Sequence, residues 1–192
     1  MLCLRTCALD GSSLGEDAAG FRWTLKKGAR VKPVRWDPDP ARDCGDGLHG
    51  MVIGRHDGKS MIQPTNPTVL WLVFRPIGGV VESSGKIRCE EAEVMEFGSR
   101  QEILERLMEQ GITGLPYSVL TGGDHSTLTG GDDSTLTGLP YSTLTGGHSS
   151  TLSIQWHDCK RYRIAVAYVG EGGILPNVPY RVNEQGKFKR VL

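Results

Sequence analysis

The chain has 192 residues, enough for one or two compact domains, and its 22 basic residues balance its 22 acidic ones. A net charge of zero provides no overall field to attract nucleic acid or an anionic membrane surface, so we expect neither as a partner. No apolar run is long enough for a membrane-spanning helix.

The cysteines are few and odd in number, and their spacing does not suggest a disulfide framework. The N-terminus lacks the long apolar segment of a signal peptide. We therefore expect reduced thiols and a cytoplasmic location. The five cysteines are Cys3, Cys7, Cys44, Cys89 and Cys159.

Residues 1–113 are expected to form an α+β domain that opens with a short apolar strand. Apolar and polar residues alternate over 21–25, which predicts a half-buried strand, and the apolar run 68–76 predicts a buried strand. The segment 36–52 is rich in Pro, Asp and Gly, which predicts a long loop. The glutamates within 90–96 are expected on a solvated strand edge.

One helix is predicted near the end of this domain. Ser99 and Glu102 have the spacing of a capping box, in which each side chain bonds the other residue's backbone N–H. Apolar residues within 103–108 then fall on one helical stripe, and Gly111 provides the C-terminal stop.

Several short motifs of this domain resemble an uncharacterised domain that is common in phage and prophage proteins. In that family, octapeptide repeats and a short β-rich end often follow the domain. The resemblance implies a mobile-element origin and carries no established activity. The motifs are Phe21-Arg22-Trp23, the turn Cys44–His49, the strand Leu70–Phe74, and Ser84–Arg88 followed by Glu91–Val94.

Residues 114–153 are five consecutive octapeptides without insertion or deletion, GLPYSVLT, GGDHSTLT, GGDDSTLT, GLPYSTLT and GGHSSTLS. Gly is first, Ser fifth and Leu seventh in every unit. The first half of each unit is typical of a turn and the second of a strand. Alternation along the strand then places Ser and Leu inside and the threonines outside.

Two octapeptides per coil would give a short two-sided β-solenoid. The strands near 118–121, 134–137 and 150–153 would form one side, and those near 126–129 and 142–145 the other. A stack this short needs caps at its ends, and an uncapped edge could pair between chains. The alternative is a disordered low-complexity tract. The units resemble the octapeptides of bacterial ice-nucleation proteins, but the Thr rows are too small for an ice-binding plane.

Residues 154–192 are expected to form an antiparallel β cap. Alternation over 162–168 predicts a strand, and 184–186 joins two further strands in a hairpin. We expect Trp156 and the tyrosines to cover the open end of the solenoid. The predicted fold is therefore mainly β with one α-helix, in three parts.

Two sets of residues suggest weak candidates for catalysis. Cys44 and His49 could form a nucleophilic pair or, with Cys3 and Cys7, a zinc site, although a structural turn whose His49 bonds a backbone carbonyl explains the same residues. Glu91 and Glu93 are similar to the E-x-E motif of ADP-ribosyltransferases, but the partner Ser-Thr-Ser strand of those enzymes is missing.

The candidates for binding lie in the second half of the chain. The repeat turns present acidic and imidazole groups, and a basic cluster follows in the C-terminal piece, where it could contact an acidic partner or line a solvated strand. These residues are Asp124, His125, Asp132, Asp133, Lys160, Arg161 and Arg163.

The leading hypothesis is a non-enzymatic protein-binding module without metal or cofactor. Given the phage resemblance, we expect an inhibitor that docks on a bacterial defence complex in the host cytoplasm, of the anti-CRISPR type. The alternatives are an enzyme of the N-terminal domain and a self-associating structural repeat protein.

Overall fold

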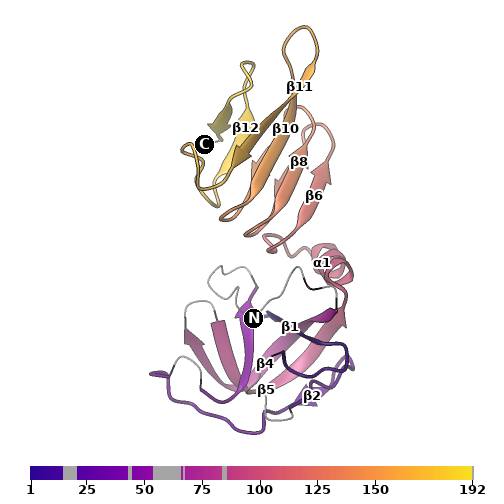
Figure 1. Cartoon of the computed structure of the whole chain (residues 1–192), viewed down its shortest axis with the longest axis vertical. Coiled ribbons are helices and arrows are strands. Elements are labelled where there is room, and N and C mark those ends of the chain that lie inside the picture. The colour runs from indigo at the N-terminus through magenta and orange to yellow at the C-terminus, as the bar shows by residue number, and fades with distance from the viewer. Residues whose placement is uncertain (15–20, 43–44, 54–65, 67, 84–85, 192) are drawn as a thin grey trace. The chain divides into compact units, whose positions relative to one another are not determined.

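The computed structural model describes residues 1–14, 21–42, 45–53, 66, 68–83 and 86–191. Over these residues the protein is mainly β, with three sheets and a single helix (Figure 1). The chain divides into two compact units, Met1–Glu109 and Gln110–Leu192, and the second contains both the repeats and the C-terminal strands.

The first unit is a five-stranded antiparallel sheet in the order β2-β5-β3-β1-β4, and β5 also pairs with β4. Its pairings therefore close into a ring around a core that includes Trp23, Leu72 and Phe74. The strands are β1 (Cys3–Ala8), β2 (Arg30–Val31), β3 (Leu48–Val52), β4 (Val69–Ser83) and β5 (Lys86–Gly98).

Two of the predicted elements of this unit are wrong. Residues 21–25 do not form a strand, and only Arg22 makes a bridge, with Ser12. The alternation there reflects side-chain packing instead, because the buried Trp23 ring lies 5.1 Å from the Phe74 ring. Residues 48–52 belong to β3, not to a loop, because pairing with β5 and β1 overrides the local turn composition.

The helix α1 (Arg100–Glu109) confirms the capping box. The Ser99 N–H donates to Glu102 Oε2 at 2.8 Å, and the Glu102 N–H donates to Ser99 Oγ at 3.3 Å. The apolar stripe packs inward except at its end, where Met108 is exposed. No described helix is long and apolar enough to cross a membrane.

The second unit consists of two four-stranded sheets. We call them the β6–β11 sheet, in the order β11-β10-β8-β6, and the β7–β13 sheet, in the order β13-β12-β9-β7. The first contains β6 (Val119–Gly122), β8 (Thr135–Gly138), β10 (Thr151–His157) and β11 (Tyr162–Tyr168). The second contains β7 (Thr127–Thr129), β9 (Thr143–Thr145), β12 (Pro179–Val182) and β13 (Phe188–Arg190).

Alternate octapeptides pair in parallel, as the repeat predicted. Leu120 lies beside Leu136 and Leu136 beside Leu152 in one sheet, while Leu128 lies beside Leu144 in the other. The C-terminal strands join these ladders antiparallel, β11 to β10 and β12 to β9.

The predicted interior of the repeat is confirmed. Leu136, Leu144 and Leu152 have no exposed surface. The repeat serines are also inward, and four of their hydroxyls donate to turn carbonyls, as Ser150 does to Gly131 O at 2.9 Å. The Ser126 hydroxyl pairs instead with that of Ser142. Thr143 departs from the outward pattern because the Arg181 side chain covers it, with Nε 2.6 Å from Thr143 Oγ1.

The predicted role of the C-terminal tyrosines is wrong for two of them. Tyr162 and Tyr168 are exposed, and only Tyr180 is buried in the repeat core. The register of β10 with β11 places Ala165 and Ala167 opposite Ile154 and Leu152, so the small side chains occupy the inward positions.

The first glycine of the second to fifth octapeptides has no room for a side chain, which leads to a prediction about stability. A Cβ on Gly130 would lie 2.7 Å from Ser134 Cβ and 2.9 Å from Leu136 Cδ2. We expect Gly130→Ala to lower the free energy of unfolding by about 1–3 kcal/mol through overpacking. Gly123→Ala is the matched control, because a Cβ there meets nothing within 4 Å. Equal stabilities in urea denaturation would contradict the packing argument.

Candidate binding site

Of the predicted Cys44 and His49 site, the structure describes His49, and Cys44 lies outside the described residues. His49 belongs to β3, and its Nε2 lies 2.8 Å from the Gly45 carbonyl oxygen. Burial lowers the pKa of this imidazole. The neighbouring Leu48 is buried in the core. This geometry agrees with the structural interpretation of the turn, in which His49 bonds a backbone carbonyl.

The other thiols considered as zinc ligands are core residues. Cys3 and Cys7 are fully buried, and burial raises the pKa of Cys3 to about 12 and that of Cys7 to about 11. Such thiols stay protonated, whereas zinc needs the thiolate. Within the described ranges, no group of three or more His, Cys, Asp and Glu residues is placed to hold a metal ion.

Glu91 and Glu93 lie on β5 and face basic side chains. Glu91 Oε2 is 3.3 Å from Lys32 Nζ, and Glu93 Oε2 is 3.5 Å from Arg75 Nη1. The predicted solvated edge is wrong, because β5 pairs with β2 and β3 as well as β4. The ion pairs explain how a strand inside the sheet carries this many acidic residues.

The fourth residue of every octapeptide has a left-handed backbone, with φ between 54° and 65°. Local composition suggested that glycine would take this role, so the sequence alone missed it. This conformation is uncommon for a non-glycine residue, and four of the five side chains are exposed. The residues are Tyr117, His125, Asp133, Tyr141 and Ser149.

The predicted turn residues therefore have different roles. Asp132 is buried, and its Oδ1 accepts from the His148 N–H at 2.7 Å, so it joins two successive turns. Asp133 is exposed at the left-handed position. His125 stacks on Tyr141 with a ring separation of 4.9 Å and an angle of 14°.

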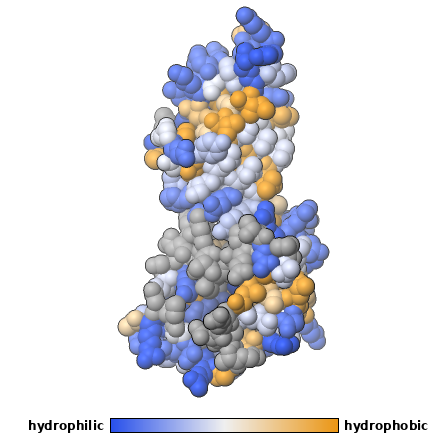
Figure 2. Space-filling view, in the orientation of Figure 1, coloured by the Kyte–Doolittle hydropathy of each residue, from blue (hydrophilic) through white to orange (hydrophobic). Residues whose placement is uncertain are grey.

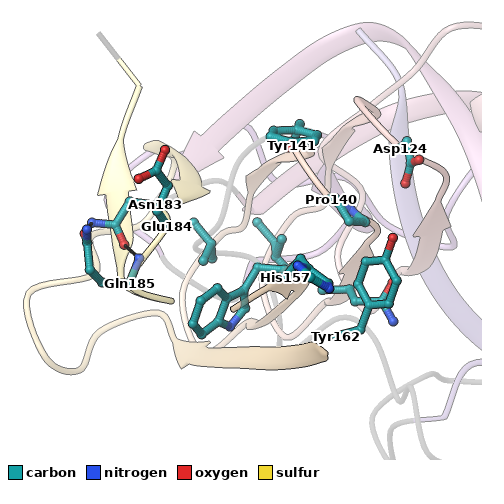
Figure 3. Close-up of a pocket in the computed structure, with 12 residues that line it drawn as sticks. Asp124, Pro140, Tyr141, His157, Tyr162, Asn183, Glu184 and Gln185 are labelled. Atoms are coloured by element: carbon teal, nitrogen blue, oxygen red, sulfur yellow. Dashed lines mark hydrogen bonds between the residues drawn. The ribbon is translucent and has the colours of Figure 1, made fainter. Parts of the chain in front are cut away.

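The turns with this stacked pair border a cleft in the second unit, with a volume of about 460 Å³ (Figure 3). It gathers residues from three separate segments, namely the repeat turns, the β10–β11 hairpin and the β12–β13 turn. The lining side chains that carry chemistry are Asp124, Tyr141, Gln155, Trp156, His157, Tyr162, Asn183, Glu184 and Gln185.

Aromatic rings line the middle of the cleft, and an acidic residue lies on each side of them. Figure 3 shows the His157 and Tyr162 rings between Asp124 on one side and Glu184 on the other. Within the described part of the chain, neither carboxylate forms a salt bridge, and no lysine or arginine lines the cleft. The site therefore carries unbalanced negative charge beside aromatic rings.

The side of the cleft near Glu184 is built on a tight turn. The Asn183 side chain accepts from the backbone N–H of Gln185 at 3.1 Å and of Lys187 at 2.9 Å, which fixes the loop. Gly186, with a φ of 74°, packs directly against the Trp156 ring. The position of Glu184 is thus set by contacts that leave its carboxylate free to meet a ligand.

The predicted basic cluster lies on the turn between β10 and β11. Asp158 accepts from the Arg161 and Lys160 N–H groups at 2.8 and 2.9 Å and forms a salt bridge with Arg163. These hydrogen bonds lower the pKa of Asp158 to about 2. The backbone N–H of Arg161 contributes most, followed by the Arg163 side chain and the backbone N–H of Lys160. Arg163 is thus neutralised, while Lys160 and Arg161 point to solvent.

Comparison with protein-family models, with curated proteins and with solved structures finds no match for this chain.

The burial of the cysteines makes a prediction about their reactivity. We expect N-ethylmaleimide at neutral pH to modify Cys159, which is exposed, and to leave Cys3, Cys7 and Cys89 unmodified until the chain is unfolded. Mass spectrometry of the labelled peptides measures each site separately. Modification of Cys3 or Cys7 at the rate of Cys159 would show that the first unit does not bury them.

Proposed function

We propose that the protein is a non-enzymatic protein-binding module whose second unit holds its partner in the cleft described above. The observation that carries this proposal is the pairing of aromatic rings with two carboxylates that lack salt bridges in the described structure. Aromatic side chains and arginine are the residues that most often dominate the binding energy at protein interfaces.

The chemistry of the cleft favours a basic side chain of the partner, and arginine best. A guanidinium group is planar, so it stacks on the face of Tyr141 or Trp156 and still donates sideways to a carboxylate. Asp124 and Glu184 stand on opposite sides of the cleft, so an arginine that enters from either side meets a carboxylate.

The repeat provides rigid support for this site. We infer that its two parallel ladders are coils of a two-sided β-solenoid, which the antiparallel C-terminal strands end. Buried leucines and serines fix each turn, so the cleft residues are held by packed elements. Binding sites supported in this way lose little conformational entropy on association.

On the resemblance to the phage domain, we propose that the partner is a bacterial defence complex and that the protein inhibits it in the host cytoplasm, as anti-CRISPR proteins do. Expression in a host with active immunity tests this narrower form. Restored plaque formation by a targeted phage, lost with the cleft variant below, would support it. Unchanged immunity with the wild-type protein would overturn it.

The cleft makes a prediction that does not depend on knowing the partner. An acetylated Gly-Arg-Gly amide should shift the NMR signals of Trp156 and Glu184, and the same peptide with neutral citrulline should not. We expect Glu184→Gln to weaken binding by about 3–10-fold through loss of one charge contact.

Glu171→Gln is the matched control, because it removes an exposed carboxylate from the same unit outside the cleft. The proposal fails where both peptides shift the same signals equally, or where the two variants bind the arginine peptide alike.

A further inference from the structure

The edge strand β11 differs from the other edges of the second unit. The edges are β6 and β11 in one sheet, β7 and β13 in the other. β11 has seven residues, whereas β6 has four and β7 and β13 have three each. Long edge strands expose backbone groups that pair readily with another strand, so most proteins shorten or protect them.

One face of β11 is apolar and open to solvent. Tyr162, Ile164, Val166 and Tyr168 are 62, 67, 51 and 54% exposed. They lie on the outer face of the β6–β11 sheet, because their partners on β10 include Ser153 and Gln155, which alternate with the buried leucine and isoleucine of that strand. Figure 2 shows apolar residues gathered on the visible face of the second unit.

Basic residues lie on the edge strand β13 itself, whereas Lys160 and Arg161 lie in the turn before β11 and not on the strand. Lys187, Lys189 and Arg190 are exposed on or beside β13, where their charges oppose pairing with another chain. The charge on β11 is Arg163, which Asp158 neutralises. β11 is therefore long, and its one charged residue is paired with an acidic residue outside the strand.

The backbone of β11 is oriented for pairing. The Val169 N–H donates to Ser150 O at 2.9 Å, so odd-numbered residues of β11 direct their backbone groups toward β10. Because direction alternates along a strand, Ile164 and Val166 direct their N–H and C=O groups away from β10. These groups lie at the free edge of the sheet.

The sequence of β11, YRIAVAY, is nearly symmetric about Ala165. Tyr162 and Tyr168 are equidistant from it, and so are Ile164 and Val166. We propose that two copies of the chain join their β11 strands antiparallel about a two-fold axis through Ala165, which unites the two β6–β11 sheets into one sheet of eight strands.

This register satisfies both the backbone and the side chains. Ile164 exchanges two backbone hydrogen bonds with Val166 of the second copy, and their side chains pack together on the outer face. Each Tyr162 meets a Tyr168. Arg163 lies opposite Ala167 instead of another arginine. A shift of the pairing by two residues in either direction would leave some of the exposed apolar side chains of β11 without a partner.

The two-fold axis gives a position-specific test. Ala165 faces its own copy as a non-hydrogen-bonded pair, at a Cα separation of about 4.5 Å that a disulfide can span. In a Cys159→Ser background, which removes the exposed thiol among the described residues, Ala165→Cys should cross-link to a covalent dimer under mild oxidation. Ala167→Cys is the control, because position 167 faces Arg163 and not itself.

Sedimentation equilibrium measures the association without the added cysteine. We expect a dimer of the wild-type chain and a monomer of the Ile164→Lys variant, whose circular dichroism verifies folding. A monomeric wild-type chain overturns the proposal. If the chain is a dimer but Ala165→Cys does not cross-link, or Ala167→Cys cross-links equally well, the register through Ala165 is overturned. Glu184→Gln should leave the dimer intact, so failure here is distinct from failure of the cleft.

Discussion

The second unit depends on one steric constraint, the close approach of the first glycine in the second to fifth octapeptides to the serine and leucine of the same unit. The Gly130 position leaves no space for a Cβ between Ser134 and Leu136. The chain can therefore fold its turn tightly over the strand that follows, and the serine hydroxyl reaches a turn carbonyl. The same closure in successive units sets the parallel register of one leucine on the next.

This constraint separates the residues that build the stack from those that can vary. Glycine, serine and leucine are fixed by packing, whereas the fourth position points outward and holds Tyr, His, Asp or Ser with positive φ. Such a backbone costs of order 1 kcal/mol or more for most side chains. The buried core offsets this cost, so Tyr141 can line the cleft while His125 stacks on its ring.

The sequence predicted the strand pairing of the repeat and the capped helix because both depend on the spacing of residues close together in the chain. It did not predict which side chains of β11 face the core and which face solvent. The alternation over 162–168 fits either orientation, and a shift of one residue exchanges the two faces. The Asp158 turn, with Cys159 at a φ of 68°, fixes the register that turns the tyrosines outward. Nor could spacing reveal the cleft, whose acidic residues Asp124 and Glu184 come from segments far apart in sequence.

The parallel repeat strands of the two sheets are completed by different antiparallel strands, and the two outer edges differ for this reason. In the β7–β13 sheet, β12 places Tyr180 beside Leu144 in the core, and the lysines at β13 then face solvent at the edge. In the β6–β11 sheet, the inward positions of β11 are filled by alanines, so its large apolar residues remain outside. The core is thus completed by Tyr180 from one sheet and by small residues from the other, which leaves one charged edge and one apolar edge. A chain that only needed to end its repeats would protect both.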